Sequence, residues 1–63
     1  MNDDAERLAD QLDAINDEIG DLVMAALRKA VADGETSRPD IEKRLTRARR
    51  SIEKASHLLR GKV

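Results

Sequence analysis

Apolar residues recur along the first half of the chain at alternating intervals of three and four residues. This first series consists of Ala5, Leu8, Leu12, Ile15, Ile19, Leu22 and Ala26. A second series, with intervals of four and three, consists of Ile41, Leu45, Ala48, Ile52, Ala55 and Leu59. Heptad spacing of this kind places the apolar side chains of a segment on one face of an α-helix. The pattern therefore predicts two amphipathic helices whose apolar series meet in a common seam.

Between the two series lies the segment DGETSRPD, which contains signals for a helix end and a helix start. Gly34 is suited to end the first helix, because glycine adopts the left-handed conformation without steric cost. Ser37 is suited to cap the second helix, with Asp40 three residues later completing a capping box. Pro39 then falls in the first helical turn, where no backbone donor is required. The segment is therefore expected to be a short turn.

The predicted fold is all-α, with helices over residues 3–33 and 38–60. A turn this short makes the two helices an antiparallel hairpin. Residues whose numbers add to about 71 are then expected to face each other, for example Ile19 and Ile52. Residues 1–63 form one small domain, and a hairpin with a single seam leaves apolar surface on the flanks of both helices. We therefore expect two chains to form a homodimer, a four-helix bundle.

The first helix also carries apolar residues outside the predicted seam, in the segment GDLVMAALRKAV. Four of them are predicted to form the oligomer interface: Val23, Met24, Leu27 and Val31. An apolar patch that faces away from an intramolecular seam is typical of an interface between molecules. The alternative is that the helix departs from heptad register and simply widens its buried stripe. Gly20, inside this helix, either permits close approach of another helix or is tolerated there.

Charge is distributed unevenly along the chain, although the net charge is only −1. Residues 1–37 contain ten acidic and three basic residues, whereas residues 38–63 contain three acidic and nine basic residues. The outward face of the first helix is acidic through about residue 21. The outward face of the second helix is predicted to carry a basic stripe made of Lys43, Arg47, Arg50 and Lys54. This stripe is the predicted contact for an acidic partner.

Three interpretations of the basic stripe remain open. The cations can pair with acidic helices, within one hairpin or between hairpins, and so select the partner and its orientation. Within the hairpin, Arg44 and Arg49 flank the predicted seam and can reach the opposite helix. The stripe can instead bind the phosphates of structured RNA or duplex DNA. The third interpretation is a solvated helix face, and the absence of aromatic residues argues against stacking on single-stranded bases.

The sequence offers few groups for catalysis or metal binding. Cysteine is absent, and His57 is the only histidine and is predicted to be exposed. Asp17, Glu18 and Asp21 are neighbouring carboxylates on one helix, an arrangement that is usually solvated and holds a divalent cation only weakly. The sequence contains no glycine-rich phosphate loop. We therefore expect no enzyme activity, no cofactor and no metal site.

The segment LDAINDEIGDLVMAALRKAV resembles the long first helix of the helical chorismate mutases. That family has a third helix and basic residues that grip a dicarboxylate; their positions have no match here, so no residue role is carried over. The two-helix plan is also similar to that of small hairpins that dimerise into four-helix bundles, among them the RNA-binding regulator of plasmid copy number. That resemblance is limited to architecture and implies no function by itself.

The expected function is a non-catalytic protein–protein interaction or regulatory module that self-associates through helix packing. Nucleic-acid binding by the basic second helix is the alternative, and a heterologous protein partner, such as a toxin, is a third. The longest apolar run, LVMAAL, is too short to span a membrane, and MNDDAE lacks the apolar core of a signal peptide. A cytoplasmic location is therefore expected, and the composition, rich in arginine and alanine, is typical of a GC-rich bacterial genome.

Overall fold

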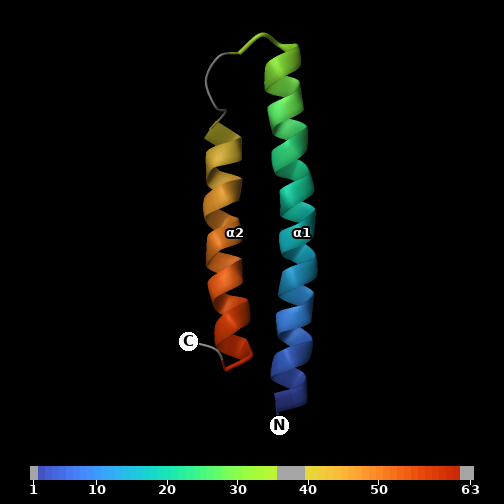
Figure 1. The fold of residues 1–63 in the computed structure, drawn as a ribbon, viewed down its shortest axis with the longest axis vertical. Helices are drawn as coiled ribbons and strands as arrows, with labels where there is room; N and C mark the ends of the chain where they lie inside the picture. The colour runs from blue at the N-terminus through green and yellow to red at the C-terminus, as the bar shows by residue number, and fades with distance from the viewer. Residues whose placement is uncertain (1, 36–39, 62–63) are drawn as a thin grey trace.

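A computed structural model of the protein describes residues 2–35 and 40–61, and this part of the chain forms two helices (Figure 1). α1 spans Asn2–Ala32 and α2 spans Asp40–Leu59. Both ends of α1 lie within one residue of the predicted ends. α2 lies within the predicted second helix and ends one residue before its predicted end. The prediction of an all-helical hairpin is therefore confirmed for the described residues.

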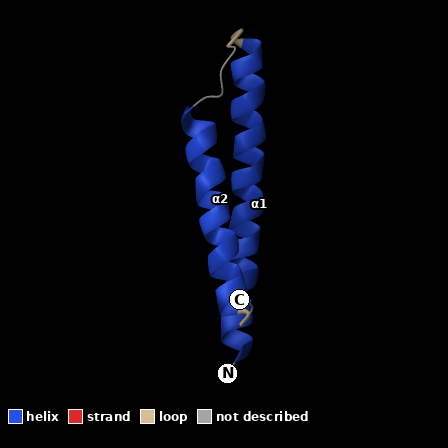
Figure 2. Ribbon diagram, turned by 60° about the vertical axis from the view of Figure 1, so that its left-hand side comes forward, coloured by secondary structure: helices blue, strands red, loops and turns tan. Residues whose placement is uncertain are grey.

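The two helices lie side by side and run in opposite directions, as both ribbon views show (Figure 1, Figure 2). The start of α1 and the end of α2 lie at the same end of the hairpin. The hairpin measures 51 Å by 17 Å by 11 Å, so it is one helix thick along its shortest dimension. A layer this thin leaves its two broad faces open. The cap predicted at Ser37 and the placement predicted for Pro39 lie outside the described residues.

Each helix is followed by a glycine in the left-handed conformation. Gly34 has a φ of 75°, and Gly61 has a φ of 80°. The amide of Gly34 donates to the carbonyl oxygen of Val31 at 3.0 Å, and the amide of Glu35 donates to that of Ala30 at 2.9 Å. These two hydrogen bonds satisfy carbonyl groups that the last turn of α1 would otherwise leave without a donor. The predicted role of Gly34 in ending the first helix is therefore confirmed.

Hydrogen bonds between the helices define the register of the hairpin. Arg49 donates from Nε to Oδ1 of Asn16 at 3.3 Å, and Ser56 donates from Oγ to Oδ1 of Asp13 at 2.8 Å. The residue numbers add to 65 in the first pair (16 + 49) and to 69 in the second (13 + 56). Both sums lie near the predicted value of about 71 for facing residues. The predicted antiparallel pairing is therefore confirmed.

Side chains spaced seven residues apart form a row along one side of a helix. The row of α1 that lies in the seam differs from the predicted one. Leu8, Ile15 and Leu22, which the heptad pattern assigns to the seam, are 43%, 46% and 56% exposed. The prediction that these side chains are buried between the helices is therefore wrong. Among the described residues, the buried positions of α1 are spaced seven apart: Ala9, Asn16, Val23 and Ala30.

Val23 requires a second correction. The heptad pattern places it outside the seam, at the predicted oligomer interface, but its side chain is only 8% exposed in the single chain. It lies in the same buried row as Ala9 and Ala30, between α1 and α2. Val23 is therefore occupied within the hairpin and does not present its side chain to another molecule.

The seam of α2 is shifted in the same way, onto a row of polar residues. Glu42 and Ser56 are each 2% exposed, and Arg49, midway between them, is half-buried. Thr46 donates from Oγ1 to Oε1 of Glu42 at 3.0 Å. Ile41, which the heptad pattern assigns to the seam, is 43% exposed. The interior of the hairpin is therefore partly polar, while large apolar side chains lie at its surface.

This rotation of the helices follows from the width of the apolar surface on α1. Three adjacent rows of α1 are largely apolar: the row of Leu12 in the middle, the row of Leu8 on one side and the row of Ala9 on the other. A single neighbouring helix covers about two such rows. The hairpin buries the row that begins with Ala9, in which Asn16 accepts a hydrogen bond from Arg49 of α2. The row of large side chains that begins with Leu8 is left in contact with solvent.

Candidate functional site

Two rows of apolar side chains form one open face of the hairpin, called the apolar face below. It consists of Leu8, Ile15 and Leu22 from α1 and Ile41, Ala48 and Ala55 from α2. Each of these residues comes directly before a position in the seam, as Leu8 precedes Ala9 and Ile41 precedes Glu42. Antiparallel helices are related by a twofold axis perpendicular to the plane that contains them. Equivalent positions therefore lie on the same side of that plane, and the two rows share one face.

The apolar face leaves a large apolar surface in contact with water. Four of its large side chains are between 43% and 56% exposed: Leu8, Ile15, Leu22 and Ile41. Complete burial of a Leu or Ile side chain stabilises a protein by about 1.5–3 kcal/mol. Covering the exposed halves of these four would contribute on the order of 3–6 kcal/mol per chain. That contribution is comparable with the whole free energy of unfolding of a small domain, about 5–15 kcal/mol.

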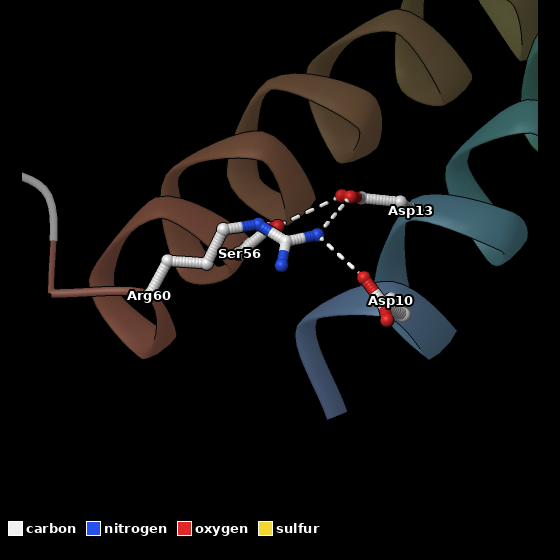
Figure 3. Close-up of polar contacts among 4 residues, drawn as sticks. All are labelled: Asp10, Asp13, Ser56 and Arg60. Atoms are coloured by element: carbon white, nitrogen blue, oxygen red, sulfur yellow. Dashed lines mark hydrogen bonds and ion pairs between the residues drawn. The ribbon is translucent and has the colours of Figure 1, made fainter. Parts of the chain in front are cut away.

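The opposite face of the hairpin is polar where the start of α1 meets the end of α2 (Figure 3). Asp10 lies on this face because it comes directly after the seam residue Ala9. Arg60 donates from Nη2 to Oδ1 of Asp10 at 2.9 Å and also to Oδ2 of Asp13. Ser56 donates to Oδ1 of Asp13, so both oxygens of this carboxylate accept hydrogen bonds from the opposite helix end. These four polar residues, called the end clasp below, tie together the open end of the hairpin.

The hydrogen bonds of the end clasp favour the charged forms of its members. They lower the pKa of the Asp13 carboxyl group below its ordinary value of 3.8. The hydrogen bond from Ser56 contributes most to this decrease, followed by the hydrogen bond from Arg60. The pKa of the Arg60 guanidinium is raised, mainly by its hydrogen bond to Asp13. The end clasp is therefore an ion pair throughout the neutral pH range.

Arg49 crosses from α2 to α1 in the middle of the seam, which confirms the prediction that it reaches the opposite helix. Besides its hydrogen bond to Asn16, its guanidinium lies over Gly20. A Cβ atom at Gly20 would be 3.3 Å from the guanidinium carbon of Arg49. The close approach at Gly20 is therefore made by the side chain of Arg49, from α2 of the same chain.

Met24, Leu27 and Val31, the other predicted interface residues, lie near the turn end of α1. Met24 and Val31 come directly after the seam residues Val23 and Ala30, so they lie on the side opposite the apolar face. Met24 is 50% exposed and Val31 is 76% exposed, while Leu27 is half-buried. This surface is an open hollow of about 350 Å³ lined by Met24, Leu27, Arg28, Val31 and Ala32. These three residues are accessible to a partner, and their role as an interface stays a prediction.

The basic stripe lies on two neighbouring rows of α2. Arg47 and Lys54 lie on the outer edge, away from α1, whereas Lys43 and Arg50 directly follow the seam residues Glu42 and Arg49 and lie on the side opposite the apolar face. Its four members are all exposed, as predicted: Lys43, Arg47, Arg50 and Lys54. Within residues 2–35 and 40–61, none of the four takes part in an ion pair. The outer edge of α1, which includes Glu18 and Asp21, lies on the other side of the hairpin, and both of these residues are also exposed. The charges of the stripe are therefore not neutralised within one chain.

His57 is exposed, as predicted. Among the residues that the structure describes, no group of three or more His, Asp and Glu side chains could hold a metal ion. No helix in the described ranges combines the length and the apolar character needed to cross a membrane. No protein-family model, curated protein or solved structure matches the chain.

Proposed function

We propose that the protein is a non-catalytic protein–protein interaction module that self-associates into a homodimeric four-helix bundle. The observation that carries this proposal is the apolar face, which runs along both helices and is open on a single chain. Large apolar side chains lie on this face, whereas Asn16, Arg49 and Ser56 lie in the seam. Two apolar faces stacked on each other would enclose a core that one hairpin lacks.

The substitution Leu22→Asp tests the proposal, with Val31→Asp as a matched control. Both residues lie on α1, and they are 56% and 76% exposed on opposite faces of the single chain. Leu22→Asp is expected to convert the dimer into a monomer, because it would place a carboxylate in the core of the bundle. A loss of about 3 kcal/mol in association free energy weakens the dimer roughly a hundredfold. Sedimentation equilibrium measures the mass, and circular dichroism reports whether the helices persist.

Val31→Asp is expected to remain dimeric. If Val31→Asp gives the monomer and Leu22→Asp does not, the interface is instead the surface formed by Met24, Leu27 and Val31. A wild-type protein that stays monomeric at every concentration measured contradicts self-association through either surface.

Nucleic-acid binding is the second candidate function, and the exposed basic stripe favours it. Its four cations are exposed on two neighbouring rows of α2 and have no ion pair within the described part of the chain. A row of this kind can contact successive phosphates of a duplex. Because the chain has no aromatic residue, stacking on single-stranded bases would contribute nothing. Structured RNA and duplex DNA are therefore the ligands proposed for this function.

Titration of the protein into labelled duplex DNA and structured RNA at several salt concentrations tests this second candidate. Contacts with four phosphates predict that log affinity falls with log salt concentration with a slope of about −3 to −4. Arg47→Glu combined with Arg50→Glu is expected to abolish binding. The matched control combines Arg7→Glu with Arg28→Glu, which reverses two exposed arginines of α1. No binding at low salt would exclude the stripe as a nucleic-acid surface.

A further inference from the structure

We infer that the apolar face is covered by a second copy of the chain, docked so that both turns lie at the same end of the bundle. In this arrangement, α1 of each chain packs beside α2 of the other. The inference rests on the proposed self-association and specifies its geometry. Charge complementarity between the two helices carries it.

Two arrangements with twofold symmetry stack one apolar face on another. A twofold axis parallel to the helices keeps both turns at one end and puts α1 beside the α2 of the partner. A twofold axis perpendicular to the helices, lying in the interface, puts the turns at opposite ends, with α1 beside α1 and α2 beside α2. The apolar face has an apolar row on each helix, so it can be stacked in either way. The charges on its flanks therefore decide between the two arrangements.

The two helices carry opposite net charges. α1 contains eight acidic and three basic residues, a net charge of −5 (3 − 8), and α2 contains three acidic and six basic residues, a net charge of +3 (6 − 3). With the turns at opposite ends, each helix lies beside a helix of the same charge. With the turns at the same end, the acidic helix of each chain lies beside the basic helix of the other. Like charges across an interface disfavour a pairing, and opposite charges select it.

Individual residues at the middle of the apolar face show the same complementarity. Glu18 comes three residues after Ile15 and lies on the outer flank of the face in α1, where it is exposed. On α2, Arg47 and Lys54 are exposed and lie on either side of the level of Glu18; they come directly before Ala48 and Ala55, so they lie farther round the helix from the apolar face than Glu18 does. In the same-end bundle, Glu18 therefore lies, along the bundle axis, between the levels of the partner's Arg47 and the partner's Lys54.

Near the turn, α1 supplies a positive charge and α2 supplies a negative charge, so the two helices are again complementary. Lys29 continues the row of Leu22 by one heptad, and Asp40 comes directly before Ile41. Both charged residues are exposed. Their numbers add to 69 (29 + 40), the same sum as for the hydrogen-bonded pair of Asp13 and Ser56, so they lie at the same level of the hairpin. The same-end bundle therefore places Lys29 near the partner's Asp40.

Distances between spin labels in the wild-type background test this geometry. The chain contains no cysteine, so one introduced cysteine gives one label per chain. Asp33→Cys places a label at the turn end of α1, and Asp17→Cys places one at its middle; both residues are exposed. In the same-end bundle, the two Asp33→Cys labels are expected within about 25 Å, because neighbouring helix axes are about 8–10 Å apart. With the turns at opposite ends, they would be roughly 45 Å apart, the length of α1.

The Asp17→Cys labels are expected within about 25 Å in either bundle, so they report dimerisation itself. Short distances at both positions support the inference. A short distance for Asp17→Cys with a long one for Asp33→Cys overturns the same-end geometry and leaves the proposed self-association standing. A monomeric mass with no coupling at either position overturns both, and the apolar face would then belong to a heterologous partner.

Discussion

Asp13 connects the two helices through both oxygens of its carboxylate, so its charge is linked to the folded state. In the hairpin, hydrogen bonds from Ser56 and Arg60 lower the pKa of Asp13 below its ordinary value of 3.8. In the unfolded chain these contacts are absent. A carboxyl group whose pKa is lowered by folding stabilises the folded state above its ordinary pKa, and this stabilisation is lost as the pH falls through the lowered value.

We therefore expect acid to weaken the hairpin through protonation of Asp13. Asp13→Asn is expected to lower the thermal midpoint at about pH 7, and its difference from wild type is expected to vanish as the pH falls through the lowered pKa of Asp13. Thermal unfolding followed by circular dichroism at a series of pH values measures both effects.

The matched control is Asp17→Asn, which removes an exposed carboxylate from the same helix. In the described part of the chain, Asp17 has no hydrogen bond to α2. The thermal midpoint of Asp17→Asn is expected to vary with pH as that of the wild type does. If the difference between Asp13→Asn and wild type were the same at every pH, the end clasp would not be the group that couples folding to pH.

α1 and α2 are each divided lengthwise into a seam row, an apolar row and a charged outer edge. α1 carries a net negative charge, and α2 carries a net positive charge. Because the apolar row lies between the seam and the outer edge, a bundle built on the apolar face brings outer edges of different chains close together. The charges of the outer edges therefore affect which helices become neighbours, and this effect can be measured separately from apolar burial.

Glu18→Lys combined with Asp21→Lys is expected to weaken the dimer, because it places new cations beside the partner's basic stripe. Exposed ion pairs contribute about 0.2–1 kcal/mol each, so four changed sites per dimer correspond to about 0.8–4 kcal/mol, or roughly fourfold to several hundredfold in Kd. The loss is expected to shrink in about 0.5 M salt, which screens surface charges. Sedimentation equilibrium at both salt concentrations measures it. A variant that dimerises more tightly than wild type would indicate that α1 lies beside α1.

The positions and ends of the helices were predictable from the sequence because they depend on local rules. The heptad series identifies each helix, and Gly34 marks the end of α1 through a backbone conformation that glycine adopts easily. The rotation of each helix about its own axis was not predictable in the same way. The rows of Leu8 and Ala9 lie on either side of the row of Leu12 on α1, and the choice between them depends on contacts spread along both helices.

A polar signal for this rotation is present in the sequence. Glu42, Arg49 and Ser56 are spaced seven residues apart, which is the spacing of a seam row. A prediction based on the spacing of apolar residues does not detect a seam row made of polar residues. The exposure of the basic stripe was predictable because its members lie far from every apolar row. The end clasp was not, because Asp13 and Arg60 are brought together only by the pairing of the helices.

The two candidate functions place different requirements on the assembled molecule. In the same-end bundle, each basic stripe lies beside an acidic helix edge, which reduces its attraction for phosphates. With the turns at opposite ends, the two copies of α2 lie side by side and present four cations, Arg47 and Lys54 of each chain, along one side of the bundle. The arrangement of the turns therefore determines whether polyanion binding and self-association support or oppose each other. The label distances and the salt titration address this question independently.

The polar residues of the seam disfavour pairings in which the two helices are misaligned. If α2 slid along α1 by one heptad, Arg49 would lie beside Ala9 or Val23 instead of Asn16. A half-buried guanidinium that loses its acceptor is destabilising, so the shifted hairpin would be unfavourable. A seam made only of leucine would accept the native and shifted pairings almost equally. Asn16 and Arg49 therefore select one alignment among several, while contributing less stability than two leucines would.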